Sequence, residues 1–288
     1  MKNIKLKILI ILALCSYQMN ANWHINNKVT FNLDEAYHEN WVKDVATNYI
    51  ITSAYFLGRY NFSANDFKWE NTVDFGYGLY LTDFQDVLGN KSEDKLNFTS
   101  SLNYKMIDEL NYNFNFDLKS QWSETFKDNA LTSNFFSPLY LMASLGATYS
   151  KKEYSVLFSP LTAKMLYVGD ERLWNQGLFG LADNEHINYN FGAYAKFNLI
   201  SWKVADNITA DGKFELFYNY AKPLKNMTEN FELTLNLKVN KWLSAFFQTY
   251  LIFDKNIIDK LQFKQRFGLM SVIQLYDSDK KNKKNKTE

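Results

Sequence analysis

Residues 231–239 read Phe-Glu-Leu-Thr-Leu-Asn-Leu-Lys-Val, and this stretch decides the fold class. Apolar side chains occupy every second position, and the positions between them hold Glu232, Thr234, Asn236 and Lys238. Successive side chains of a β-strand point to opposite faces, so the stretch predicts a strand with one apolar and one polar face. A helical period does not explain the alternation.

The same alternation recurs along the chain. Residues 112–119, for example, place aromatic and leucine side chains on one face and Asn113, Asn115, Asp117 and Lys119 on the other. The pattern predicts about twelve strands. They lie near residues 23–33, 46–61, 67–83, 93–106, 110–124, 135–149, 154–167, 186–201, 207–220, 228–239, 242–253 and 261–276.

The predicted connections alternate in length, and every odd-numbered one is longer than its neighbours. They cover residues 34–45, 62–66, 84–92, 107–109, 125–134, 150–153, 168–185, 202–206, 221–227, 240–241 and 254–260. Outer-membrane barrels combine short periplasmic turns, longer outside loops and an even number of antiparallel strands. The chain is therefore predicted to be an all-β, transmembrane, up-and-down antiparallel β-barrel in the outer membrane of a Gram-negative bacterium.

The composition agrees with such a barrel. A mean hydropathy of −0.35 excludes a bundle of membrane helices, although 17% of the 288 residues are aromatic. Aromatic residues gather near strand ends, as interfacial girdles require: Tyr104, Trp122, Tyr149, Trp202, Tyr220 and Trp242. The formal net charge of +1 argues against a general nucleic-acid binder, which would carry a basic face.

Both ends of the chain are predicted to lie outside the barrel domain, which spans residues 22–276. Residues 1–21 have the lysines and short apolar core of a secretory signal peptide. Cys15, the single cysteine, lies in this segment, so no disulfide framework or thiol nucleophile is expected in the mature protein. The lysine-rich residues 277–288 are predicted to form a solvated, disordered periplasmic tail.

The polar faces of the strands are predicted to line the lumen. Eight residues are candidates for facing it: Asn113, Asn115, Asp117, Lys196, Glu215, Glu232, Asn236 and Lys238. Twelve strands lie between eight-stranded barrels, which side chains fill, and sixteen-stranded porins, which hold aqueous channels. The lumen is therefore expected to be a narrow pore or to be plugged by charged pairs.

No catalytic or metal-binding pattern is present. His24, His38 and His186 do not have metal-ligand spacing, so no metal or cofactor is predicted. The long connections nevertheless place acidic residues and histidines at one rim, where they could perform general acid–base chemistry: His38, Asp83, Asp86, Asp170, Glu171, Asp183, Glu185 and His186. Exposed loops are commonly rich in charge, and we expect no enzymatic activity.

Pro160 falls inside a predicted strand, in the run Ser159-Pro160-Leu161-Thr162. Proline removes a hydrogen-bond donor from the strand ladder and is normally confined to edges or bulges. Because a closed barrel has no edge, a β-bulge that bends the wall is predicted here. The alternative is a weak point in the wall, used for lateral exit of a lipidic substrate.

A series of short motifs, taken in order, resembles the uncharacterised outer-membrane barrel family known as domain of unknown function 3078. The motifs include Asn40-Trp41, Trp69 with Asp74-Phe75-Gly76-Tyr77-Gly78, Lys91 with Asp94-Lys95-Leu96, Ser137-Pro138-Leu139-Tyr140, Phe158-Ser159-Pro160-Leu161-Thr162, and Lys238-Val239-Asn240-Lys241. The resemblance runs from about Asn40 to about Lys255. It implies a barrel but no activity, and the chain departs from it where Val42 and Lys43 replace an expected pair of glycines.

The leading functional hypothesis is a passive, narrow channel for small solutes or a structural membrane protein. Two alternatives are a hydrolase acting at the extracellular rim and a soluble exported barrel that binds an apolar ligand inside. The predicted partners are outer-membrane lipid and, during insertion, the barrel-assembly machinery, which would engage the terminal Leu275-Tyr276. No nucleic acid partner and no cofactor are expected.

Overall fold

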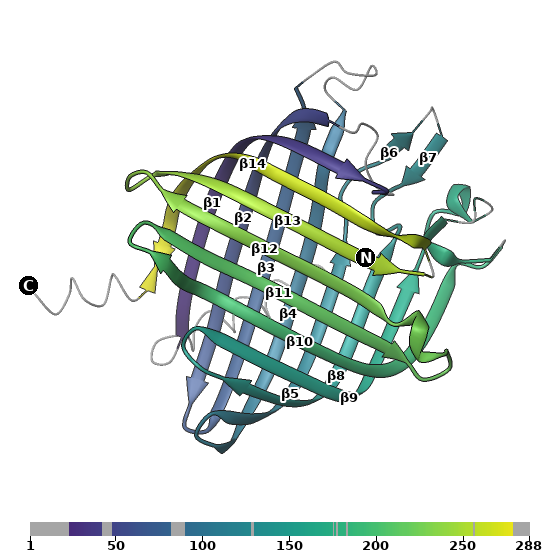
Figure 1. Ribbon diagram of the computed structural model, residues 1–288. Coiled ribbons are helices and arrows are strands. Elements are labelled where there is room, and N and C mark those ends of the chain that lie inside the picture. The colour runs from purple at the N-terminus through teal and green to yellow at the C-terminus, as the bar shows by residue number, and fades with distance from the viewer. Residues whose placement is uncertain are drawn as a thin grey trace, which may run out of the picture.

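The computed structural model describes residues 23–41, 48–81, 90–127, 130–174, 176, 178–182, 184–255 and 257–278. Twelve antiparallel strands close into a barrel, in which the first and the last strand pair with each other (Figure 1). The barrel strands are β1 (Trp23–Glu39), β2 (Asn48–Ala64), β3 (Phe67–Tyr80), β4 (Lys91–Ile107), β5 (Leu110–Ser120), β8 (Leu139–Ser150), β9 (Tyr154–Tyr167), β10 (Ile187–Ala205), β11 (Ile208–Asn219), β12 (Thr228–Lys238), β13 (Leu243–Asp254) and β14 (Ile258–Asp277).

The remaining elements are short and lie in the connections. They are the hairpin β6 (Thr125–Lys127) and β7 (Ala130–Ser133), and the 3-10 helices η1 (Glu171–Leu173), η2 (Leu178–Gly180) and η3 (Leu224–Asn226). None of the helices among the described residues is long and apolar enough to cross a membrane.

The twelve predicted strands are all present, with boundaries that differ by a few residues. The largest difference is at β1, which continues from the predicted end at residue 33 to Glu39. Alternation continues there in a less obvious form, because Asp34 and His38 face inward while Glu35 and Tyr37 face outward. The hairpin β6–β7 lies inside the predicted connection 125–134 and was not predicted.

The apolar faces of the strands point outward. On β14 the side chains of Phe267 and Leu269 are 60% and 49% exposed, whereas Arg266 is 3% exposed. Leu235 pairs with Phe247, which pairs with Phe267, so the apolar face of the 231–239 stretch is also on the outside. An apolar exterior around a polar interior is the arrangement of an outer-membrane barrel and excludes a soluble barrel with an apolar lumen.

Exposed aromatic side chains lie at both ends of the barrel. Tyr104, Trp202 and Trp242 are next to short turns, and Trp122 and Tyr220 are next to long connections. Their exposed fractions lie between 45% and 61%. They form the two girdles that anchor such barrels at the membrane–water interfaces.

The strand ends that the long connections join lie at one end of the barrel, which we call the long-loop end (Figure 1). The long connections are residues 40–47, 81–90, 121–138, 168–186 and 220–227. The predicted length rule is wrong at the last connection, because residues 255–257 are fewer than residues 239–242 at the opposite end. There β13 and β14 continue pairing as far as Asp254 and Ile258, which leaves three residues between the two strands. Barrels of this kind turn their long loops to the cell exterior.

The bulge predicted at Pro160 is confirmed. The pairing of β9 shifts register at this point with both neighbours, β8 and β10. Ser159 and Thr162 both face inward and are buried, while Pro160 and Leu161 between them are exposed. The β8 neighbour at the bulge is Gly146, where an added Cβ would lie 2.0 Å from the Phe158 carbonyl oxygen. A bulge at this point therefore requires glycine beside it.

Candidate functional site

The predicted lumen residues of β5 belong to a polar wall shared with β4. The Asn113 amide donates to Asn103 Oδ1 at 2.9 Å, and Thr99 Oγ1 donates to Asp117 Oδ1 at 2.6 Å. Asn115 donates to the other oxygen of the Asp117 carboxylate. Asn113, Asn115 and Asp117 are all buried.

The other predicted lumen residues lie on β10 and β12 and on β11 between them. Lys196 and Glu215 are register partners, and Glu232 is 3.3 Å from the Lys213 amine. Asn236 Nδ2 donates to Asp211 Oδ2 at 3.0 Å. Lys238 differs from these residues, because it is exposed at the end of β12 next to a short turn.

An ion-pair cluster that the sequence analysis missed crosses the lumen. Arg266 on β14 donates to both carboxylate oxygens of Asp34 on β1, at 2.7 and 2.8 Å. Its third nitrogen, Nη1, lies 3.1 Å from Glu93 on β4 and 3.1 Å from the Tyr55 hydroxyl on β2. The side chains of Arg266 and Asp34 are 3% and 0% exposed. We call Arg266, Asp34, Glu93 and Tyr55 the Arg266 cluster.

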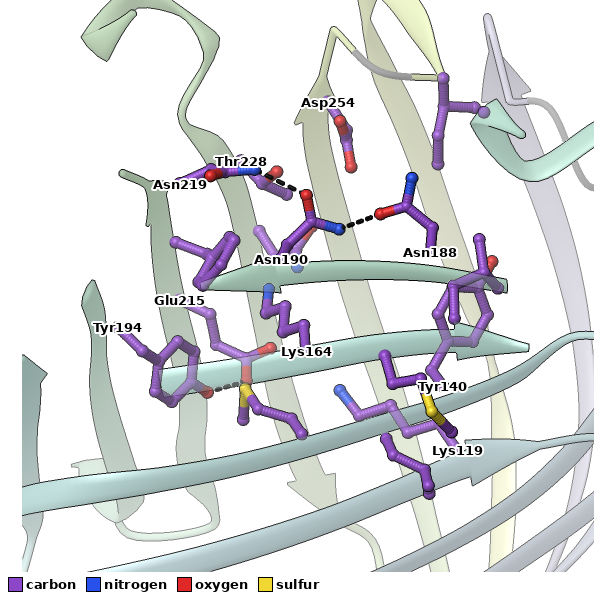
Figure 2. A pocket seen from close by; sticks show the side chains of 18 of the residues that line it. Lys119, Tyr140, Lys164, Asn188, Asn190, Tyr194, Glu215, Asn219, Thr228 and Asp254 are labelled. Atoms are coloured by element: carbon purple, nitrogen blue, oxygen red, sulfur yellow. Dashed lines mark hydrogen bonds between the residues drawn. The ribbon is translucent and has the colours of Figure 1, made fainter. Parts of the chain in front are cut away.

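A cavity of about 240 Å³ opens on the other side of the lumen, toward the long-loop end (Figure 2). Of the eight predicted lumen residues, Asp117 and Glu215 line it. The charged or polar lining also includes Lys119, Lys164, Asn188, Asn190, Asn219 and Asp254, and the aromatic and apolar lining includes Tyr140, Met142, Tyr194 and Phe217. The alternation of residues 112–119 could have added Lys119 to the predicted lumen residues. Lys164 on β9 could not be assigned to a face before the bulge at Pro160 was known.

Three of the rim residues that the structure describes have separate surroundings. Asp170 accepts hydrogen bonds from Arg172 at 2.7 Å and Asn134 at 2.8 Å, and these donors hold the pKa of its carboxyl well below the usual range. The His186 ring stacks on Trp174, with centroids 4.7 Å apart, while His38 is buried next to Tyr49.

The remaining rim candidates are either exposed or outside the described residues. Glu171 and Glu185 are exposed, and Asp83, Asp86 and Asp183 are not among the residues that the structure describes. Within the described ranges, no group of three or more His, Cys, Asp or Glu residues is placed to hold a metal ion.

Comparisons with solved structures find other barrels. The COG4313 outer membrane channel from Pseudomonas putida F1 is 13% identical over 88% of this chain and 97% of its own, with a TM-score of 0.40. Outer membrane phospholipase A from Escherichia coli is 13% identical over 84% and 92%, with a TM-score of 0.44. The translocator domain of the autotransporter NalP from Neisseria meningitidis is 9% identical over 93% and 95%, with a TM-score of 0.39.

No curated protein matches the chain. The model of the family described as "Protein of unknown function (DUF3078)" matches residues 33–126, which run from within β1 to β6. The motifs at Asn40, Trp69 and Lys91 fall inside the match, and those from Ser137 onward fall outside it. The resemblance of this chain to the DUF3078 family is therefore confirmed over residues 33–126.

Proposed function

We propose that the protein is a passive outer-membrane barrel whose lumen admits small polar solutes and excludes larger ones. The observation that carries this proposal is the Arg266 cluster. The guanidinium of Arg266 joins β14 to Glu93 on β4, which is four strands away around the barrel wall. A side chain held in this way narrows the lumen, while the polar walls of β4, β5 and β10–β13 keep the remaining path favourable for hydrated solutes.

The proposal predicts small conductance that depends on Arg266. In planar lipid bilayers the wild-type protein is expected to show small, weakly selective steps or none, and nothing of porin size. Arg266→Ala removes the side chain that reaches Glu93, so the steps should become several-fold larger. The measurement is single-channel recording, with the folded fraction of each preparation checked by heat-modifiable migration on a gel.

Arg59→Ala is the matched control for the conductance experiment. Arg59 shares the inward face of β2 with Tyr55 but lies near the opposite end of the barrel and is exposed. Its loss removes a lumen cation away from the Arg266 cluster, so the step size should stay unchanged. Large, stable conductance in the wild-type protein would contradict a narrowed lumen. An unchanged step size in folded Arg266→Ala would show that Arg266 does not set the width of the path.

We also propose that the barrel is not an enzyme and that its partners are outer-membrane lipid and, during insertion, the barrel-assembly machinery. General-base catalysis needs a histidine within hydrogen-bond reach of its partner. The contacts of the His186 ring are with Trp174 and Tyr167, which supports a structural role for this histidine. The terminal Leu275 and Tyr276 are 57% and 39% exposed, which leaves them accessible during assembly.

Hydrolysis assays test the non-enzyme proposal. Purified protein in detergent is expected to release neither fatty acid from phospholipid nor fragments from peptides above the rate of a protein-free sample. Turnover by the wild-type protein that is lost in folded His186→Ala would overturn the proposal. His24→Ala is the matched control, because His24 lies at the opposite end of the barrel.

A further inference from the structure

Three amide side chains of the cavity form a hydrogen-bonded chain with one direction (Figure 2). The backbone N–H of Ala221 donates to Asn219 Oδ1 at 2.9 Å. Asn219 Nδ2 then donates to Asn190 Oδ1, and Asn190 Nδ2 donates to Asn188 Oδ1, each at 2.6 Å. A backbone N–H can only donate, so the first bond fixes the orientation of all three amides.

The chain of amides ends in a hydrogen-bond donor. The Oδ1 of Asn188 is occupied by Asn190, so Asn188 offers its Nδ2 to the cavity, and no described residue accepts from it. Hydrogen bonds linked in one direction polarise one another, which strengthens the terminal donor. A ligand that binds at Asn188 should therefore present a hydrogen-bond acceptor, such as a carboxylate oxygen.

Two lysines bring positive charge to the same part of the wall. Lys119 pairs with Tyr140 across β5 and β8, and Lys164 on β9 pairs with Asn190 on β10. Among the described residues, no acceptor hydrogen-bonds either amine. The Lys164 amine lies over the Phe217 ring, 3.8 Å from its centroid. Figure 2 shows both amines directed into the cavity.

The carboxylates deeper in the cavity already have other partners. Asp117 accepts from Thr99 and Asn115, and Glu215 accepts from Tyr194 and lies 3.6 Å from Lys213. At the mouth, Asp254 and Lys222 contribute opposite charges. The amines of Lys119 and Lys164 lie within Coulombic reach of Glu215, but no acceptor among the described residues hydrogen-bonds them, so both can still donate to a ligand.

We propose that the cavity binds a small carboxylate with an apolar or aromatic body. The carboxylate would accept hydrogen bonds from Asn188 and the two lysine amines, and the body would pack against Met142 and Phe217. The cavity, at about 240 Å³, is smaller than the roughly 300–1,000 Å³ sites of drug-sized ligands. The site thus fits a single-ring acid. This inference rests on the proposed function in one respect, since it names the class of solute that would enter the lumen.

Sodium benzoate is the probe that tests the site. Ligand-observed NMR on the detergent-solubilised full chain should detect saturable benzoate binding. Benzamide, which has the same ring and no charge, should not bind detectably. Lys164→Met keeps the length of the side chain and removes the charge, so the dissociation constant for benzoate should rise at least about tenfold, which is 1.4 kcal/mol.

Lys68→Met is the matched control, because Lys68 is an exposed β3 lysine at the opposite end of the barrel. Lys68→Met should leave the dissociation constant for benzoate unchanged. Asn188→Ala removes a hydrogen-bond donor without changing the charge of the cavity, and it should weaken benzoate binding. Inorganic phosphate competing as well as benzoate would overturn the role of the apolar wall. No benzoate binding, equal binding by Lys164→Met, or equal binding of benzamide would overturn the site.

The binding and conductance experiments can fail independently. Benzoate binding without any conductance in wild-type or Arg266→Ala protein would leave the site intact and overturn the channel. Small conductance without benzoate binding would overturn the carboxylate site and leave the channel intact.

Discussion

Arg266→Met is expected to lower the free energy of unfolding by about 3–5 kcal/mol, the loss typical of a buried ion pair deprived of one partner. The loss is large because the Asp34 side chain is 0% exposed and its carboxylate takes two hydrogen bonds from Arg266. Methionine preserves most of the length but leaves Asp34 and Glu93 without their cation. Equilibrium unfolding in urea from lipid vesicles measures the difference.

Two further variants separate the ion pair from a general effect of losing a cation. Arg59→Met removes an exposed arginine of β2 and should change the free energy of unfolding by no more than about 0.5 kcal/mol. Adding Asp34→Asn to Arg266→Met should recover part of the loss, because the unpaired buried charge is then gone. Equal losses in Arg266→Met and Arg59→Met would contradict the role assigned to the cluster.

The strands and their facing could be predicted from the sequence because alternation is a local property. Residues two positions apart share a face wherever they lie in the barrel, so Leu235 and Asn236 could be assigned to opposite faces without knowledge of any partner. The alternating lengths of the connections, typical of outer-membrane barrels, then placed the apolar face outside. The rule of alternation would have extended the first strand through Asp34 and His38. Glu35 interrupts the apolar side of the pattern there, and this hides the continuation of the strand.

The Arg266 cluster could not be predicted because it depends on closure and register. Arg266 and Glu93 are 173 residues apart, and they meet only once β14 pairs with β1 and the wall continues through β2 and β3 to β4. Alternation gives the face of each side chain and says nothing about its height in the barrel. The same limit applies to the cavity, where Lys164 meets Asn190 only after the bulge at Pro160 has shifted the register of β9.

The connections were harder to predict than the strands. The hairpin β6–β7 consists of strands three and four residues long, too short for a period of two to be recognised. The last connection is shorter than predicted because Asp254, Asp259 and Lys260 look like loop residues in the sequence, yet they belong to β13 and β14. Pairing at strand ends is decided by the neighbouring strand and not by the local pattern.

Leu235→Arg is expected to destabilise the barrel by about 1–3 kcal/mol, the cost of a charged side chain on the lipid face between the bilayer midplane and the interface, three residues from the end of β12. Leu235 lies inside β12 and pairs with Phe247 and Ala210 on the outward face. An arginine there must leave its charge in hydrocarbon or bend toward the interface. The measurement is again equilibrium unfolding in urea from lipid vesicles.

Asn236→Arg is the matched control, because it introduces the same side chain one position further along the same strand. Asn236 faces the lumen and donates to the Asp211 carboxylate at 3.0 Å, so an arginine there meets an anion in place of lipid. Its cost should be much smaller than that of Leu235→Arg. Equal costs, or a larger cost at Asn236, would mean that the apolar face of β12 is not in contact with lipid. Successive side chains point to opposite faces, so a strand in the reversed orientation would turn Asn236 toward lipid and Leu235 toward the lumen.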